Sequence, residues 1–171
     1  MPTTLHLIAN AHLDPVWLWD RHEGLNQGIA TCRTMLDLLD EDPDFTFIRG
    51  EAAIYEHLER FDPKTFARIA AYVDSGRWEI VGGNYIQPDT NLPATETLAR
   101  HFLRGQGYFQ SRFGKTPRIA WAATPLATAP GCRRSSRRLV SKATPSAAQA
   151  RGSCPWSPPP SGGRRRAVPA F

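Results

Sequence analysis

The 171-residue sequence predicts an α/β fold in which short strands alternate with helices, followed by a disordered tail. Three observations lead to this prediction. Short apolar runs are bounded by turn residues, the segments between them have helical spacing of apolar residues, and the composition changes abruptly near residue 123. Strands that alternate with helices pair in parallel, and their functional site lies at the carboxyl ends of the strands. The site is therefore expected in the loops that follow the strands.

The first two elements show both patterns clearly. The apolar run at residues 4–9 predicts a buried strand of the parallel type. Residues 23–39 predict a helix, because their apolar side chains recur at helical spacing on one face. These side chains are Ile29, Cys32, Leu36 and Leu39. Residues 42–44, Asp-Pro-Asp, then predict a turn.

The remaining elements continue the alternation. Strands are expected over residues 45–48, 78–81 and 118–122, and helices over residues 52–60, 64–75 and 95–113. Gly76 is expected to end the helix that precedes it, because glycine readily adopts the left-handed conformation that closes many helices.

Charge divides the sequence into two unlike parts. Residues 1–123 contain 12 Lys and Arg and all 16 Asp and Glu, whereas residues 124–171 contain the other nine basic residues and no acidic one. The second part also holds eight of the 15 prolines. A segment without periodic apolar residues buries too little surface to offset the entropy lost on ordering. Residues 124–171 are therefore predicted to be a disordered, basic, Pro-rich tail.

The stretch from His12 to Trp19 directly follows the first predicted strand and carries the clearest chemistry. Side chains two residues apart on an extended backbone point the same way, so His12 and Asp14 can share one ion. An imidazole and a carboxylate suit zinc, with manganese or cobalt as alternatives. The other interpretation is a His and an Asp that shape a turn before Pro15. Crowded indoles beside the pair favour a site.

These motifs, in their order, resemble the glycoside hydrolases of family 38, the α-mannosidases, which open with a strand followed by His-x-Asp-Pro-x-Trp. Residues 76–85, Gly-Arg-Trp-Glu-Ile-Val-Gly-Gly-Asn-Tyr, and 88–93, Pro-Asp-Thr-Asn-Leu-Pro, resemble the family's next segment. The helix from Thr95 continues the match, and the resemblance covers about residues 4–122. It implies that residues 1–123 form a partial N-terminal domain, the first half of an irregular β/α barrel.

The resemblance also implies a zinc-dependent retaining hydrolase that acts on an α-mannoside or oligosaccharide. His12 and Asp14 match the family's first two zinc ligands, and Trp17 matches the Trp that packs against the sugar at the zinc. Asp89 and Asn91 are candidates to hydrogen-bond sugar hydroxyls. The alternatives are a core indole for Trp17 and a loop-shaping role for the other two.

The family's third zinc ligand, an Asp that is also the catalytic nucleophile, has no counterpart in this sequence. The family has it in the motif Asp-Ser-Phe-Gly-His, expected near Thr124, shortly after a strand that ends at a Trp such as Trp121. The codons that can encode residues 124–136, read one base earlier, admit this motif. We interpret the tail as out-of-frame translation after a single-base deletion, in the gene or in its sequencing. The sequence as written then predicts an inactive fragment that binds zinc poorly.

Glu51 and Glu79 are further acidic residues near strand ends, but neither matches a catalytic motif of the family. Glu51 is expected at the start of a helix, where a negative charge is favoured. A retaining glycosidase needs two carboxyl groups about 5 Å apart, and in the family the acid/base partner and the fourth zinc ligand, a His, lie beyond the matching segment.

Cellular context and partners follow from composition. The three cysteines, Cys32, Cys132 and Cys154, fit neither a metal spacing nor an even disulfide set. The sequence shows no signal peptide and no membrane span, so we expect a cytoplasmic protein without a membrane partner. The sequence does not determine the oligomeric state. A rival hypothesis is a non-catalytic acidic scaffold whose basic tail binds nucleic acid; the out-of-frame interpretation of the tail weighs against it.

Overall fold

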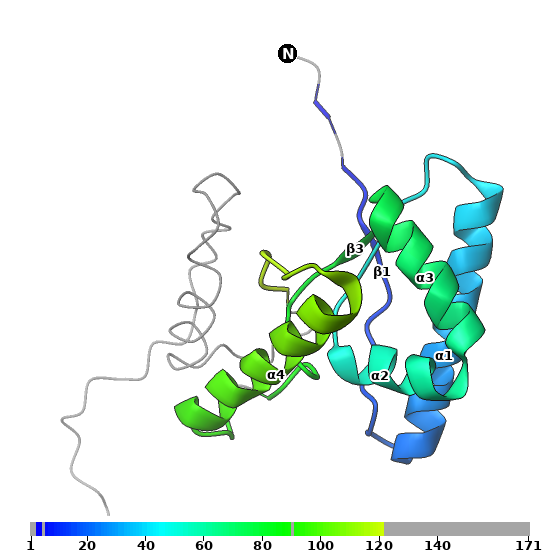
Figure 1. The fold of residues 1–171 in the computed structure, drawn as a ribbon. Coiled ribbons are helices and arrows are strands. Elements are labelled where there is room, and N and C mark those ends of the chain that lie inside the picture. The colour runs from blue at the N-terminus through cyan, green and yellow to red at the C-terminus, as the bar shows by residue number, and fades with distance from the viewer. Residues whose placement is uncertain (1–2, 5, 90, 122–171) are drawn as a thin grey trace, which may run out of the picture.

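The computed structural model describes residues 3–4, 6–89 and 91–121. Helices and strands alternate along the chain (Figure 1). In order they are β1 (Ala9–Asn10), α1 (Arg21–Glu41), β2 (Phe47–Arg49), α2 (Ala52–Phe61), α3 (Pro63–Ser75), β3 (Trp78–Ile80) and α4 (Thr95–Phe113). The strands form one sheet in the order β1-β2-β3, and both neighbouring pairs are parallel. The predicted α/β fold with parallel pairing is confirmed.

The helices lie close to where the sequence places them. α4 spans the predicted residues, and α1 is longer than expected by two residues at each end. The apolar face of α1 is buried as expected, and Leu25 extends it. Gly76 closes α3 with a φ of 80° and donates its backbone N–H to the end of that helix. Local spacing and capping signals were therefore sufficient for the helices.

The strand predicted over residues 4–9 is present but was wrong in extent, and the strand predicted over residues 118–122 was wrong for residues 118–121. Residues 6–8 lie outside β1, and Leu7 and Ile8 are 85% and 62% exposed. β1 pairs with β2 at only two positions and has no other strand beside it within the described residues. Residues 118–121 also form no strand, although Gly82 N–H donates to the carbonyl of Ile119 at 2.8 Å. A strand can extend only as far as a neighbouring strand offers hydrogen-bond partners.

Three predictions stay untested. The sheet of the described residues has three strands, so closure into a barrel remains an expectation. The predicted tail, residues 124–171, lies outside the described residues. No helix in the described part of the chain is both long and apolar enough to cross a bilayer, and the cytoplasmic location stays a prediction.

The core forms where the helices cover one face of the sheet. Phe47 and Trp78 are buried and meet edge to face, with ring centroids 4.7 Å apart, whereas Glu79 points to the opposite, exposed side of β3. α1 and α3 run side by side (Figure 1), and α4 packs on α2 through Phe109, whose ring lies 5.3 Å from that of Tyr55. Such aromatic pairs add to the free energy gained from burial alone.

A buried chain of hydrogen bonds joins β3, α2 and β2. The indole N–H of Trp78 donates to the Tyr55 hydroxyl at 2.8 Å, and that hydroxyl donates to the carbonyl of Arg49 at 3.0 Å. Burial raises the pKa of Tyr55, so its hydroxyl stays protonated and able to donate. The end of β2 is therefore fixed against the helix that follows it.

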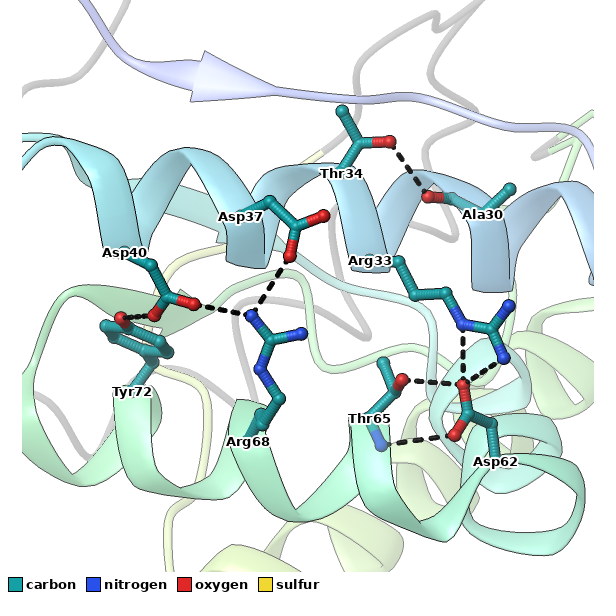
Figure 2. A network of polar contacts seen from close by, with 9 residues as sticks. All are labelled: Ala30, Arg33, Thr34, Asp37, Asp40, Asp62, Thr65, Arg68 and Tyr72. Carbon is teal, nitrogen blue, oxygen red and sulfur yellow. Dashed lines mark hydrogen bonds and ion pairs between the residues drawn. The ribbon is translucent and has the colours of Figure 1, made fainter.

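Polar side chains tie α1 to α3 on the outer surface (Figure 2). Asp62 caps α3 and accepts from the backbone N–H of Thr65 at 3.2 Å and from its hydroxyl at 2.6 Å. Arg33 of α1 donates to the same carboxylate through two nitrogens, at 2.8 and 2.7 Å. Farther along, Arg68 contacts both Asp37 and Asp40. Of these carboxylates, Asp62 is the most buried.

Asp62→Asn should lower the free energy of unfolding at pH 7 by about 1 kcal/mol, because the amide can still cap α3 but accepts weaker, uncharged hydrogen bonds from Arg33 and Thr65. The hydrogen bonds from Thr65 and Arg33 lower the pKa of Asp62. Its stabilisation is therefore full above the ordinary carboxyl pKa of about 3.9 and is lost as the pH falls through the lower folded value. Urea unfolding at several pH values should show the difference from the native chain shrinking below about pH 4.

Asp37→Asn is the matched control, because Arg68 keeps Asp40 as a partner. It should change stability by less than about 0.5 kcal/mol. An equal loss in both variants, or a loss at Asp62 that persists at low pH, would contradict the assigned role of Asp62.

Gly105 and Gly107 of α4 provide a second matched pair. A Cβ at position 105 would lie 2.5 Å from the carbonyl oxygen of Gly83 and from the carbonyl carbon of Asn84, whereas a Cβ at position 107 meets nothing within 4 Å. Gly105→Ala should therefore cost about 1–3 kcal/mol. Gly107→Ala should stabilise by up to about 1 kcal/mol. Urea unfolding measures both; equal effects would show that α4 does not press on the loop after β3.

Candidate active site

The loop after β1 brings together the two residues that the sequence predicts as a metal pair. Nε2 of His12 lies 3.4 Å from Oδ1 of Asp14. The His12 side chain is 20% exposed and that of Asp14 is 51% exposed, so the pair sits at the surface of the sheet's carboxyl end. The expected side-by-side placement is therefore present, while the identity of the ion stays a prediction.

Trp19 holds this loop, and the sequence did not distinguish it from Trp17. The Trp19 indole N–H donates to the backbone carbonyl of Asp14 at 2.9 Å. Gly24, in the first turn of α1, allows the close approach, because a Cβ there would lie 2.2 Å from the carbonyl oxygen of Pro15. Trp17 is 65% exposed, so the alternative of a core indole is wrong for it. Contact between Trp17 and a sugar stays a prediction.

The loop after β3 carries the two predicted sugar contacts. Asp89 and Asn91 are both exposed, and Oδ1 of Asp89 accepts from the backbone N–H of Asn91 at 2.9 Å. This is the loop-shaping bond that the alternative interpretation expects. Hydrogen bonding to sugar hydroxyls remains a prediction for both residues.

A small cavity of about 10 Å³ opens beside His12 at the carboxyl ends of the strands. The cavity is lined by residues at or just after the ends of the three strands, and by Trp121. The lining residues are Asn10, Ala11, His12, Arg49, Gly50, Glu51, Gly82, Asn84, Gln87 and Trp121. Several buried polar atoms on these walls have no hydrogen-bond partner among the described residues: Nε and Nη2 of Arg49, Oε1 of Glu51 and Nε1 of Trp121. Polar atoms this buried are usually paired.

Glu51 precedes α2, as expected, but its side chain makes no capping hydrogen bond. The first amides of the helix are satisfied from elsewhere: Ala52 N–H donates to the carbonyl of Asn84 at 3.2 Å, and Ala53 N–H to that of Tyr85 at 2.8 Å. Glu51 is 7% exposed and turned into the cavity. Burial raises the pKa of its carboxyl, while the charges of Arg49 and His12 oppose that rise.

The remaining acidic and cysteine residues considered from the sequence do not join His12 and Asp14. Glu79 lies on the exposed side of β3, and Cys32 is buried in the core as a free thiol. The missing nucleophile position, Thr124, lies outside the described residues. Within the part of the chain that the structure describes, no group of three His, Cys, Asp or Glu residues could hold a metal ion. His12 and Asp14 therefore form a pair without a third such side chain beside them among the described residues.

Residues 2–125 match the model of the N-terminal domain of glycosyl hydrolases family 38. The chain belongs to this family. It is 32% identical over 118 residues to alpha-mannosidase 2C1 of Homo sapiens, and 30% identical over 120 residues to the alpha-mannosidase of Saccharomyces cerevisiae. These matches cover 69% and 70% of this chain and 11% of each relative. The family prediction is confirmed, and the chain spans about a ninth of the relatives' length.

Solved structures agree with the fold. An alpha-mannosidase from Enterococcus faecalis V583 superposes with a TM-score of 0.57 and 26% identity, over 64% of this chain and 12% of that one. A 4-alpha-glucanotransferase from Thermococcus litoralis has the same TM-score at 15% identity, over 78% of this chain and 20% of that one, and shows similarity of fold alone. The described residues are thus similar to a small part of a larger α-mannosidase.

The two indoles give a test of the loop geometry. Trp19→Phe removes the hydrogen bond to Asp14 and should lower the free energy of unfolding by about 0.5–1.5 kcal/mol. Trp17→Phe, at the exposed position, should change it by less than about 0.5 kcal/mol. Urea unfolding followed by far-ultraviolet circular dichroism measures both. A larger loss at Trp17 than at Trp19 would contradict the assignment of Trp19 as the residue that holds the loop.

Proposed function

We propose that this chain is the N-terminal part of a zinc-dependent retaining α-mannosidase, and that the chain as written has no activity. Family membership supports the hydrolase, and the His12–Asp14 pair at the carboxyl end of a parallel sheet supports the metal. Sites of α/β sheets lie at this edge. The α-mannosidase names of the relatives favour α-mannosides as substrates.

The geometry of the pair fits zinc. Two ligand atoms about 2.1 Å from a tetrahedral zinc lie about 3.4 Å apart. The distance from Nε2 of His12 to Oδ1 of Asp14 is 3.4 Å. Nitrogen and oxygen donors of these types are ordinary zinc ligands, but a catalytic zinc has three protein ligands. The pair is therefore suitable but incomplete.

The residues of this chain have separate tasks in the proposed reaction. His12 and Asp14 hold the zinc, which supplies a Lewis acid for sugar hydroxyls. Trp17, with its exposed indole, offers a flat apolar surface to the C–H face of a mannose ring. Asp89 and Asn91 are placed in an exposed loop where they can bind hydroxyls.

Retention of configuration requires two carboxyl groups about 5 Å apart, one to attack the anomeric carbon and one to protonate the leaving oxygen. The nucleophile is absent from the sequence, because Thr124 stands where the family motif has Asp. Glu51 cannot replace it, because it is buried in a cavity the size of one water molecule. The chain as written therefore binds a substrate at most.

Zinc binding by the 171-residue chain should be weak, because two protein ligands fall short of the three that a catalytic site uses. Metal analysis after dialysis measures it. A parent protein with the corrected frame should retain about one zinc per chain. Tight zinc binding by the 171-residue chain that is lost in His12→Ala would contradict the view that the site is incomplete.

Activity should return with the reading frame. Inserting one base between the codons of Trp121 and Thr124 in the parent gene should restore the Asp nucleophile, and the product should hydrolyse an aryl α-mannoside with retention, because two successive attacks invert twice. His12→Ala or Asp14→Ala should then abolish turnover, while His6→Ala and Asp44→Ala, exposed outside the site, should leave it unchanged. A corrected enzyme that ignores α-mannosides, or that keeps full activity without Asp14, would contradict the proposed function.

A further inference from the structure

A second and larger pocket lies where the start of α1, one face of α2, the loop after β3 and α4 meet. Its volume is about 420 Å³, within the range of about 300–1,000 Å³ that is usual for sites of small molecules. Its walls carry three arginines and two histidines, against two glutamates. The pocket therefore presents more positive than negative groups to solvent.

Both glutamates of the pocket are already engaged by neighbouring side chains. Glu56 lies 3.6 Å from the guanidinium group of Arg104 and accepts from the hydroxyl of Tyr85. Glu59 lies 2.8 Å from the guanidinium group of Arg112, which stands outside the pocket. The two acidic charges are therefore balanced by Arg104 and Arg112.

The other four basic side chains of the pocket form a cluster without an acidic partner among the described residues. They are Arg21 and His22 at the start of α1, and His57 and Arg60 on α2. None of the four takes part in an ion pair that the described residues form. Asp20, which caps α1, does not line the pocket. We call these four side chains the basic cluster.

The fold holds the basic cluster together against electrostatic repulsion. Arg21 and His22 lie in the first turn of α1, where the helix dipole disfavours positive charge. Burial lowers the pKa of His57, and the charges of Arg21, His22 and Arg60 lower it further. The hydrogen-bond partner of the His57 ring is the uncharged Asn26, at 3.4 Å. Features that oppose local stability without compensation are typical of functional sites.

A phosphate group has the charge and the acceptor atoms that the basic cluster lacks. Guanidinium groups bind phosphate oxygens through paired N–H donors. The guanidinium group of Arg60 lies over the ring of Phe61, 5.1 Å from its centre, so this contact restricts it before any ligand binds. A phosphate alone would fill only a small part of the 420 Å³. The carboxylates of Glu56 and Glu59, on the same walls, can accept hydrogen bonds from hydroxyl groups.

We propose that this pocket binds a sugar phosphate: Arg21 and Arg60 bind the phosphate oxygens beside His57, and Glu56 and Glu59 accept from hydroxyls of the sugar. The site would give the protein a means of sensing a phosphorylated carbohydrate. It requires neither zinc at His12 and Asp14 nor the corrected reading frame, because each of its residues is present in the chain as written.

The first test measures the pKa of His57 in the 171-residue chain by NMR of the histidine rings, with the signals identified by their absence in His57→Gln. Inorganic phosphate should raise this pKa toward the ordinary histidine value, because a bound anion offsets the neighbouring cations. Sodium chloride at the same ionic strength is the control, since screening by salt weakens the same repulsion. An equal rise of the pKa in chloride and in phosphate overturns the proposal.

Arg21→Gln and Arg60→Gln each remove one cation of the basic cluster. Arg118→Gln is the matched control, because Arg118 is exposed and does not line the pocket. The dissociation constant of glucose 6-phosphate, followed through the His57 signals, should rise about tenfold in each of the first two variants and less than about twofold in the control. Following His57 separates this binding from phosphate attracted by the basic residues 124–171. Equal effects in all three variants overturn the proposal.

Three further ligands identify the class of molecule that the pocket takes. Glucose 6-phosphate should bind at least about tenfold more tightly than inorganic phosphate, and glucose should leave the His57 signals unchanged. Equal affinity for inorganic phosphate and glucose 6-phosphate overturns the assignment to a sugar phosphate. Binding of glucose as tight as that of its phosphate overturns the role of the basic cluster. Tighter binding of a phosphoserine peptide than of glucose 6-phosphate overturns the proposal in favour of a protein partner.

Discussion

Two backbone hydrogen bonds between the start of α2 and the loop after β3 determine the arrangement of the site. Ala52 and Ala53 donate to the carbonyls of Asn84 and Tyr85, so the amides that a capping side chain would otherwise bind are already satisfied. Glu51 is thereby released from capping and held with a φ of 70°. The same bonds draw the ends of β2 and β3 together beside His12, and the small cavity results from that closure.

The core and the candidate site differ in whether their buried polar groups have hydrogen-bond partners. On the helical side of the sheet, Trp78, Tyr55 and the carbonyl of Arg49 form a continuous buried chain with each donor paired. At the carboxyl ends, the side chains of Arg49 and Glu51 keep unpaired atoms although both are buried. Proteins leave buried polar groups without hydrogen-bond partners mainly where function requires it. The unpaired atoms face the cavity that His12 lines, which is also where an α/β sheet carries its ligands.

Local signals in the sequence predicted the helices and the placement of His12 beside Asp14. Helical spacing and a terminal glycine determine α3 and α4, and the two-residue alternation places His12 beside Asp14 without help from distant residues. The extent of β1 could not be predicted, because it depends on how many partners β2 offers. The conformation of Glu51 could not be predicted either, because backbone hydrogen bonds from the next two residues to residues more than 30 positions away hold it.

The most direct test of the His12–Asp14 pair is anomalous diffraction at the zinc edge from crystals of the chain soaked in millimolar zinc, a concentration at which even an incomplete site fills. A zinc ion within about 2.0–2.2 Å of both Nε2 of His12 and Oδ1 of Asp14, with water completing its shell, is the expected result. The two protein atoms should stay close to their metal-free separation of 3.4 Å. Zinc bound elsewhere on the chain, with none between these two side chains, would contradict their assignment as metal ligands.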